Sequence, residues 1–330
     1  MDWNAILVTT VEAAVNWETV VYALAAIGIN IQFGYAGLLN FGQAAFLGVA
    51  AYGMAVTVAT FNLPFWLGIL IGLVGAVVLA FLLGIPTLRL RADYLAIVTI
   101  AAAEIIRLIF RSVEFSSIFG GSDGRQGFAG EFFAMNPYPR GEYAIGPFGF
   151  NEGVMWVLTV GWILVILASL LVYLLMKSPW GRVLKAIRED EDAVRSLGKN
   201  VFAYKMQALI LGGVIGCLGG YIFALGQASV QPDLFGTEFT FYAYTIVILG
   251  GAARVFSPVV GAVIFWVLLV FVGNTLSEMV ASGIIPSSIM TVNQVGPVRF
   301  MLVGLGLMLL LIFRPQGIFG DKREIALDAR

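Results

Sequence analysis

Long apolar runs restrict the fold of this chain more than any other feature. A run of about 20 apolar residues is long enough for an α-helix to cross the hydrocarbon core of a bilayer. Nine such runs can be drawn, near residues 17–34, 37–60, 63–84, 93–111, 153–176, 205–227, 239–254, 257–278 and 297–313. With 60% hydrophobic and 12% charged residues, the chain has too little charge to cover a soluble globule of this size. The sequence therefore predicts an all-α polytopic membrane protein with about nine transmembrane helices, forming a single transmembrane domain over residues 1–330.

The Lys and Arg residues are distributed unevenly around these runs. Seven of the 19 fall in the segment 177–205, two follow the third run, one follows the seventh and four lie in the C-terminal tail. If the N-terminus is outside, all of these lie on the inner side of the membrane. The other five lie within the fourth run or at the opposite face. Because cytoplasmic loops carry the excess of positive charge, segment 177–205 and the C-terminus are predicted to be cytoplasmic. The N-terminus and the longest loop, 112–152, are then external.

The segment 177–205, KSPWGRVLKAIREDEDAVRSLGKNVFAYK, is too charged to lie in hydrocarbon. Ser178 followed by Pro179 suits a helix start, because Ser caps free amides and Pro loses nothing at the first helical position. Gly198 suits the helix end. On a continuous helix the apolar residues between them form one stripe: Val183, Leu184, Ile187, Val194 and Leu197. We interpret 178–198 as an amphipathic helix that docks on another protein. The alternative is a solvated loop whose charges only enforce topology.

The second run, GYAGLLNFGQAAFLGVAAYG, combines many glycines with the amides of Asn40 and Gln43. Small residues allow close helix packing, and irregular backbone at membrane depth is tolerated only inside the protein or along a wet cavity. These residues either serve packing between helices, or they mark a broken helix that lines a substrate path near the bilayer midplane. The seventh and eighth runs also place paired glycines and a Pro between apolar halves, which is compatible with an inverted repeat.

Two opposite charges lie inside the fourth run. Glu104 and Arg107 are three residues apart, so they share one face of a helix and can pair. Isolated charges at this depth would be costly. The two residues either form a structural ion pair near the outer face, or Glu104 faces the pathway and contacts an amino group of the substrate. Thr99 adds polar character one to two turns earlier, on the inner side.

Several functional classes lack the residues that they need. The chain has no His and a single Cys, which excludes Ser-His-Asp catalysis, His proton relays, an internal disulfide and a cysteine metal site. It contains no GxxxxGK[ST] phosphate loop, so ATP hydrolysis would need a separate chain. A net charge of −1 argues against nucleic acid as a partner. We expect a transport subunit without cofactor or metal rather than an enzyme. A stand-alone secondary carrier or channel is the alternative, with Glu104 as its candidate for ion coupling.

Four blocks carry a family resemblance and together extend over nearly the whole chain: GYAGLLNFGQAAFLGVAAY, LGIPTLRLRADYLAIVTIAAAEIIRL, SPWGRVLKAIREDEDAVRSLG and LLIFRPQGIFG. The sequence resembles the permease subunits of ABC importers for branched-chain and other hydrophobic amino acids. More narrowly, it is similar to the second of the two permeases in that family's heterodimer. One departure is Gln43, at a position where many relatives carry His.

The resemblance implies a role for the charged segment and a set of partners. In the family this segment is the cytoplasmic coupling helix that fits a groove on the ATPase subunit. The residues expected to contribute are Gly181, Arg182, Leu184, Ile187, Arg188, Glu189, Asp190, Leu197 and Gly198. The expected partners are a second permease subunit, ABC ATPase subunits, membrane lipid, and a substrate-binding protein received by the loop 112–152. The expected location is a bacterial cytoplasmic (inner) membrane.

Asn40, Gln43, Thr99 and Glu104 are the expected residues of the substrate pathway. Sparse amides and a hydroxyl among Phe, Leu and Val suit a small zwitterion with an apolar side chain better than a sugar or a polyanion. We therefore expect import of branched-chain or other neutral hydrophobic amino acids. Urea and short amides, which related permeases carry, are the alternative substrates.

Overall fold

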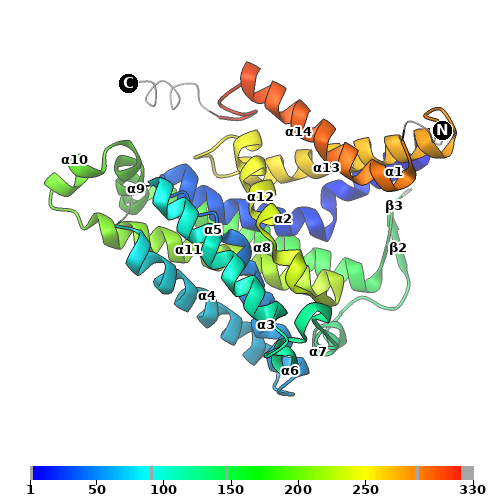
Figure 1. The fold of residues 1–330 in the computed structure, drawn as a ribbon, viewed down its shortest axis with the longest axis horizontal. Helices are drawn as coiled ribbons and strands as arrows, with labels where there is room; N and C mark the ends of the chain where they lie inside the picture. Colours follow the sequence, from blue (N-terminus) through cyan, green and yellow to red (C-terminus); the bar gives the residue numbers. More distant parts are fainter. Residues whose placement is uncertain (1–2, 90–91, 146–147, 287–289, 321–330) are drawn as a thin grey trace.

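The computed structural model is a bundle of helices and describes residues 3–89, 92–145, 148–286 and 290–320. The longer helices are α1 (Trp3–Val15), α2 (Trp17–Ile29), α3 (Gln43–Ala59), α4 (Phe65–Thr87), α5 (Ala92–Arg111), α8 (Glu152–Lys177), α9 (Pro179–Glu189), α11 (Val201–Gln227), α12 (Thr237–Gly250), α13 (Ser257–Ala281) and α14 (Val295–Phe313). A short helix, α10 (Glu191–Ser196), follows α9, and the two form a hairpin at one end of the bundle (Figure 1). Four of the cations used for the topology prediction lie outside the described residues: Arg91, Lys322, Arg323 and Arg330.

Six helical segments in the described part of the chain are long and apolar enough to cross a membrane, and α3 is a shorter apolar helix. The outward surfaces of the long helices are apolar, as shown by the exposed side chains of Leu82 on α4, Ile166 on α8 and Phe313 on α14. Helix α5 carries four charged residues, and α12 has 14 residues, so neither meets the same criteria. The prediction of an all-α polytopic membrane protein is confirmed, whereas the count of nine spans and the inverted repeat stay predictions.

Two interruptions break the helical order, one near residue 36 and the other near residue 253. Helix α2 passes into a π-helix, η1 (Asn30–Tyr35), and residues 37–42 are not helical before α3 begins. Gly37 in this stretch has a φ of +67°, which favours glycine. The second interruption, residues 251–256, separates α12 from α13 and contains Ala253 with a φ of +59°. The helix expected over 37–60 therefore begins only at Gln43.

Helix α11 lies in the core and contacts its neighbours through glycines. A Cβ added at Gly212 would lie 2.5 Å from the carbonyl oxygen of Gly28 on α2. A Cβ added at Gly220 would lie 2.2 Å from the carbonyl oxygen of Leu47 on α3. Helices α2 and α3 therefore approach α11 backbone to backbone, which only small residues allow.

The loop expected over 112–152 is ordered where the structure describes it, and its residues 146–147 lie outside that part. It contains α6 (Ser116–Phe119), η2 (Gly121–Asp123), β1 (Arg125–Gln126), α7 (Gly130–Ala134), β2 (Glu142–Ile145) and β3 (Phe148–Asn151). Strand β1 pairs antiparallel with β4 (Ser229–Val230), and β2 pairs with β3. The remaining short elements are η3 (Pro232–Phe235) and η4 (Val292–Gln294). The loop is thus a small structured cap on the helical bundle.

Candidate functional site

A network of buried amides fills the interruption between α2 and α3. Asn40 and Gln32 are fully buried, and Asn40 Nδ2 donates to Gln32 Oε1 at 2.9 Å. Gln32 Nε2 donates in turn to the carbonyl of Leu209 on α11 at 3.1 Å. Asn40 Oδ1 accepts from the Gly42 N–H at 2.9 Å, and its carbonyl accepts from the Tyr244 hydroxyl of α12 at 2.9 Å. Buried polar groups are costly without partners, so these bonds are what allow a non-helical stretch to lie inside the bundle.

Hydroxyl groups from two other helices hold the start of α3. Thr99 Oγ1 of α5 accepts from the Phe41 N–H at 3.0 Å, and Thr240 Oγ1 of α12 accepts from the Ala44 N–H at 3.0 Å. Both threonines are buried. The Ala44 N–H belongs to the first turn of α3 and the Phe41 N–H to the non-helical stretch before it, so neither has a partner within the helix, and these hydroxyls satisfy donors that would otherwise be orphaned. The start of α3 is thereby fixed between α5 and α12.

Gln43 lies in the same region, but its amide is only half satisfied. Nε2 donates to the carbonyl of Gly212 on α11 at 3.2 Å, whereas the buried Oε1 has no hydrogen-bond partner among the described residues. Glycine makes room for the side chain, since a Cβ added at Gly216 would lie 2.0 Å from Nε2. An unsatisfied buried acceptor costs about 1–3 kcal/mol. Packing alone therefore gives no reason for an amide at this position.

The four expected pathway residues do not form one site. Asn40, Gln43 and Thr99 lie together around the start of α3, but all three side chains are fully buried. No substrate reaches them in this conformation. The hydrogen bonds of Asn40 and Thr99 show a packing role, and the pathway role of all three residues stays a prediction that requires α3 to move away from its neighbours.

Glu104 belongs to a separate cluster of charges. Arg107 Nε and Nη2 donate to its two carboxylate oxygens at 3.0 and 2.6 Å, a bidentate ion pair. Arg107 also binds Asp233 of η3, which accepts from Arg111 at 3.2 Å. The ion pair expected from the sequence is present, and the side chain of Glu104 is 39% exposed. Sequence reasoning missed Asp233, because it lies far from α5 in the chain.

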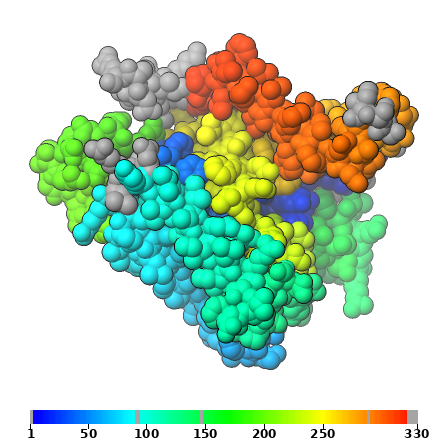
Figure 2. Space-filling view, viewed as in Figure 1, coloured from blue at the N-terminus to red at the C-terminus, as the bar shows by residue number. Residues whose placement is uncertain are grey.

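The charged segment 177–205 folds as two helices, where the sequence predicted one. Helices α9 and α10 meet at Asp190, whose extended backbone ends α9. Its side chain accepts from the Ala193 N–H at 2.9 Å and so caps α10. Ser178 caps α9 as predicted, accepting from the Trp180 N–H at 3.2 Å. Figure 2 shows this hairpin projecting from the end of the molecule.

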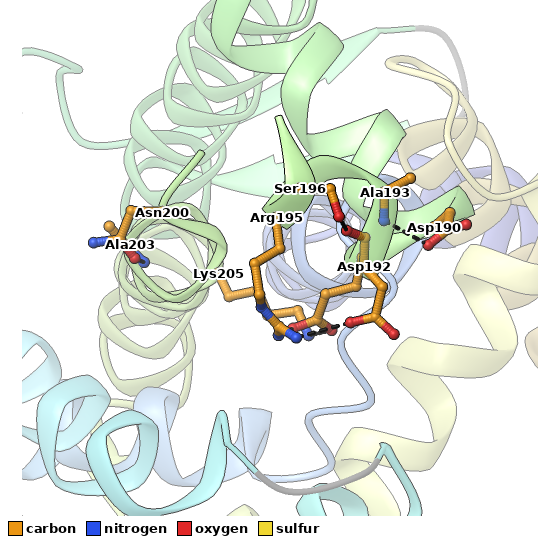
Figure 3. A network of polar contacts seen from close by, with 9 residues as sticks. Asp190, Asp192, Ala193, Arg195, Ser196, Asn200, Ala203 and Lys205 are labelled. Carbon is orange, nitrogen blue, oxygen red and sulfur yellow. Dashed lines mark hydrogen bonds and ion pairs between the residues drawn. The ribbon is translucent and has the colours of Figure 1, made fainter. Parts of the chain in front are cut away.

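Ion pairs tie α10 to the start of α11 (Figure 3). Glu191 accepts from Arg195 at 2.8 Å and from Lys205 of α11, and Arg195 also pairs with Asp192 at 2.8 Å. Asn200 caps α11. Exposed pairs contribute only about 0.2–1 kcal/mol each, but the side chain of Lys205 is 14% exposed, so its pair is better sheltered from solvent. The network fixes the orientation of the hairpin.

The apolar stripe of this segment is buried in the protein's own core. Leu184 is 0% and Ile187 is 3% exposed, and Ile187 packs against Val194. Gly181 lies against the end of α8, where an added Cβ would be 2.5 Å from Met176 Cα. In this structure Leu184 and Ile187 anchor the hairpin to its own bundle, so the prediction that they fill a groove on another protein finds no outward-facing stripe here and stays a prediction.

Other residues of the expected coupling set are exposed. Leu197 is 80% exposed, because the break at Asp190 turns α10 out of the register of a single helix. Arg182, Glu189, Asp190 and Gly198 are exposed as well. These five residues are the part of the expected coupling set that is most accessible to a partner.

Arg188 joins the hairpin to the first interruption. Its Nη1 donates to the carbonyl of Gly34 in η1 at 2.5 Å, across 154 residues of sequence. A Cβ added at Gly37 would lie 3.3 Å from Arg188 Cγ. Lys185, one turn earlier, places Nζ 5.6 Å from the ring centroid of Tyr35. Helix α9 therefore touches η1 directly, a contact that no local pattern indicated.

Asn30 joins the two interruptions and was also missed. Its Nδ2 donates to the carbonyl of Arg254 at 2.8 Å, and its Oδ1 accepts from the Ala253 N–H at 2.9 Å. The side chain is 1% exposed. Asn30 and Gln32 are the polar residues in the apolar stretch IGINIQFGYAG, and this signal could have identified both.

Comparison with known proteins assigns the chain to a family. Residues 14–312 match the family described as branched-chain amino acid transport system / permease component, and the chain belongs to this family. It is thus a multi-pass membrane permease, a transport subunit rather than an enzyme.

Three relatives are similar along most of the chain. The high-affinity branched-chain amino acid transport system permease protein LivM of Salmonella typhimurium is 32% identical over 316 residues, covering 92% of this chain and 69% of the relative. The protein of the same name from Escherichia coli (strain K12) is 30% identical over 315 residues, with the same coverage. A probable branched-chain amino acid transport permease protein LivM of Methanocaldococcus jannaschii is 26% identical over 339 residues, covering 91% of both chains.

Proposed function

We propose that this chain is one of two permease subunits of an ATP-driven ABC importer that carries branched-chain or other neutral hydrophobic amino acids into a bacterial cell. The observation that carries the proposal is the family match over residues 14–312, together with relatives named for high-affinity branched-chain amino acid transport that align with 92% of the chain. The distribution of positive charge supports a cytoplasmic position for the hairpin and the C-terminus. A substrate-binding protein delivers the amino acid from the opposite side.

The α9–α10 hairpin is the proposed contact with a separate ATPase. Its exposed surface is charged and presents Leu197 as a large apolar side chain at the tip. Buried apolar anchors usually carry most of the energy of an interface, while rim charges tune its specificity. Movement of the ATPase would reach the first interruption through the bond from Arg188 to Gly34.

The exposed face of α5 is the proposed boundary of the substrate pathway. Among the described side chains of this helix, the larger exposed ones before Arg111 are apolar, and Glu104 lies half-exposed beside them: Tyr94, Ile97, Val98, Ile105, Leu108 and Ile109. A carboxylate in contact with lipid is costly, which argues against lipid on this face. A second permease packed against α5 would place the Glu104–Arg107 pair at a hydrated gap between subunits, where an ammonium group of the substrate would compete with Arg107 for the carboxylate and the apolar side chains would contact the rest of the substrate.

Reconstitution tests the proposal directly. The chain is purified with the subunits that copurify with it, placed in proteoliposomes with its binding protein, and assayed for uptake of labelled leucine and labelled urea. We expect an ATPase to copurify and leucine uptake to require ATP. Uptake driven by an ion gradient without any ATPase would establish the carrier alternative, and preferential uptake of urea would establish the amide alternative.

Labelling tests the orientation. In a chain carrying Cys217→Ser, the variant Asp192→Cys places a thiol on the exposed surface of the hairpin. We expect a membrane-impermeant maleimide to reach it only after the cells are permeabilised. Labelling in intact cells would overturn the proposed topology.

A further inference from the structure

A cleft of about 560 Å³ lies beside the hairpin and is not used by the proposed pathway. It is formed by the end of α8, by α9, by η1 and by the interruption between α12 and α13. Tyr35, Tyr173, Met176 and Phe256 supply large parts of its walls. Most of the cleft surface is therefore apolar and aromatic.

Three cations from three different elements border this cleft: Lys177 at the end of α8, Lys185 on α9 and Arg254 in the second interruption. Lys177 Nζ lies 4.2 Å from the ring centroid of Tyr173 and donates to its hydroxyl. Within the described residues, neither lysine takes part in an ion pair, and the cleft lining contains no carboxylate. An ammonium group has three donors, so both lysines keep N–H groups for a ligand.

We propose that this cleft binds an anionic phospholipid, with the phosphate at Lys177 and Lys185 and the acyl chains along the apolar wall. Basic pockets between membrane helices are suited to anionic head groups. The outer face of α8 continues the apolar wall toward the bilayer, since Leu170 and Leu174 are 50% and 58% exposed. An anionic phospholipid can use both the two lysines and the apolar wall of the cleft, because it carries a charged head group and apolar acyl chains. A free phosphate would leave the aromatic walls wet, and a zwitterionic amino acid would bring its ammonium group among cations with no carboxylate to receive it.

The position of the cleft means that a bound lipid affects the contact between the hairpin and η1. A molecule bound there contacts α8, α9, η1 and the second interruption at once, all of which border the cleft. Occupancy therefore stabilises the contact of the hairpin with η1. The proposal concerns a lipid site in the membrane and does not depend on which amino acid is transported.

Native mass spectrometry of the assembled transporter tests lipid binding, using phosphatidylglycerol and phosphatidylcholine as probes. The variant Lys177→Gln/Lys185→Gln removes the two lysines, and Lys199→Gln/Arg140→Gln removes two exposed cations elsewhere as a control. Each basic residue near an anionic lipid contributes about fivefold in affinity, so we expect phosphatidylglycerol to bind the double variant about 25-fold more weakly. The control should bind it like the parent chain. Lys177→Arg/Lys185→Arg, which keeps both charges, should restore binding and shows that loss in the Gln variant is not misfolding.

Three outcomes would overturn the proposal. Equal retention of both lipids would show that the cleft has no preference for an anionic head group. Displacement of phosphatidylglycerol by millimolar inorganic phosphate would assign the lysines to a free anion. Binding to the isolated chain but not to the assembled transporter would show that a partner subunit covers the cleft.

Discussion

Removing the guanidinium of Arg188 should uncouple ATP hydrolysis from transport. Its bond to the Gly34 carbonyl is short, at 2.5 Å, and the side chain is only partly exposed. Hydrogen bonds that involve a charged group contribute about 1.5–3 kcal/mol. At about 1.4 kcal/mol for each factor of ten, Arg188→Ala shifts the balance between an attached and a detached hairpin by roughly 10- to 150-fold. The anchors Leu184 and Ile187 are untouched, so the hairpin should remain folded.

The assay measures uptake and ATP hydrolysis in the same proteoliposomes. We expect Arg188→Ala to copurify with the ATPase and to hydrolyse ATP at the basal rate, while substrate uptake per ATP falls at least tenfold. Lys199→Ala, which removes an exposed cation from the same hairpin, should leave this ratio unchanged. Gly37→Ala gives an independent probe, because it forces an L-residue into a φ of +67° beside Arg188, at a cost of roughly 1–2 kcal/mol.

Two results would refute this reasoning. A normal ratio of uptake to hydrolysis in Arg188→Ala would show that the bond to Gly34 transmits nothing. Loss of the ATPase from the purified complex would place Arg188 in the docking surface itself, rather than between that surface and the first interruption.

Leu197→Asp should abolish ATPase copurification without lowering the thermal stability of the chain. Leu184→Asp should instead unfold the hairpin, because burying an unpaired charge costs about 4 kcal/mol or more. If Leu184→Asp lost the ATPase at normal stability and Leu197→Asp kept it, the buried stripe would be the docking surface. Gly212→Ala should destabilise the bundle by about 1–3 kcal/mol in detergent melting, because the new Cβ meets the backbone of α2. Gly304→Ala on α14, with open space around it, is the matched control and should not lower stability. Gln43→Leu should keep the melting temperature, since it removes a half-satisfied amide, but lower uptake; unchanged uptake would leave Gln43 a packing residue only.

The helices were predictable wherever a long apolar run ends in polar or charged residues. Helices α4, α8 and α11 lie close to the runs near 63–84, 153–176 and 205–227. The boundary of α3 was less predictable, because the chain up to Gln43 is as apolar as the helix that follows. What ends the helical order there is a set of partners from distant segments, such as Thr99 and Tyr244, and no local pattern reports them.

The hairpin shows where a periodic pattern misleads. A stripe at about 100° per residue holds only along one continuous helix. Asp190 interrupts it, and an Asp followed by acidic residues is itself a signal for the start of a new helix. A helix that restarts at Asp190 no longer keeps Leu197 in the stripe of Leu184 and Ile187, which agrees with the exposure of Leu197 and the burial of the other two.

The two interruptions and the hairpin form one connected unit. Asn30 bonds the backbone of the second interruption to η1, and Arg188 bonds η1 to α9. Within the first interruption, Asn40 and Gln32 carry the hydrogen bonds that continuous helix would otherwise provide. A side-chain bond can change partners without unwinding a turn of helix, so such a stretch can adopt a second arrangement at lower cost than an α-helix can. We therefore expect a displacement of α9 to act first on η1, and through Asn30 on the α12–α13 junction in the same movement.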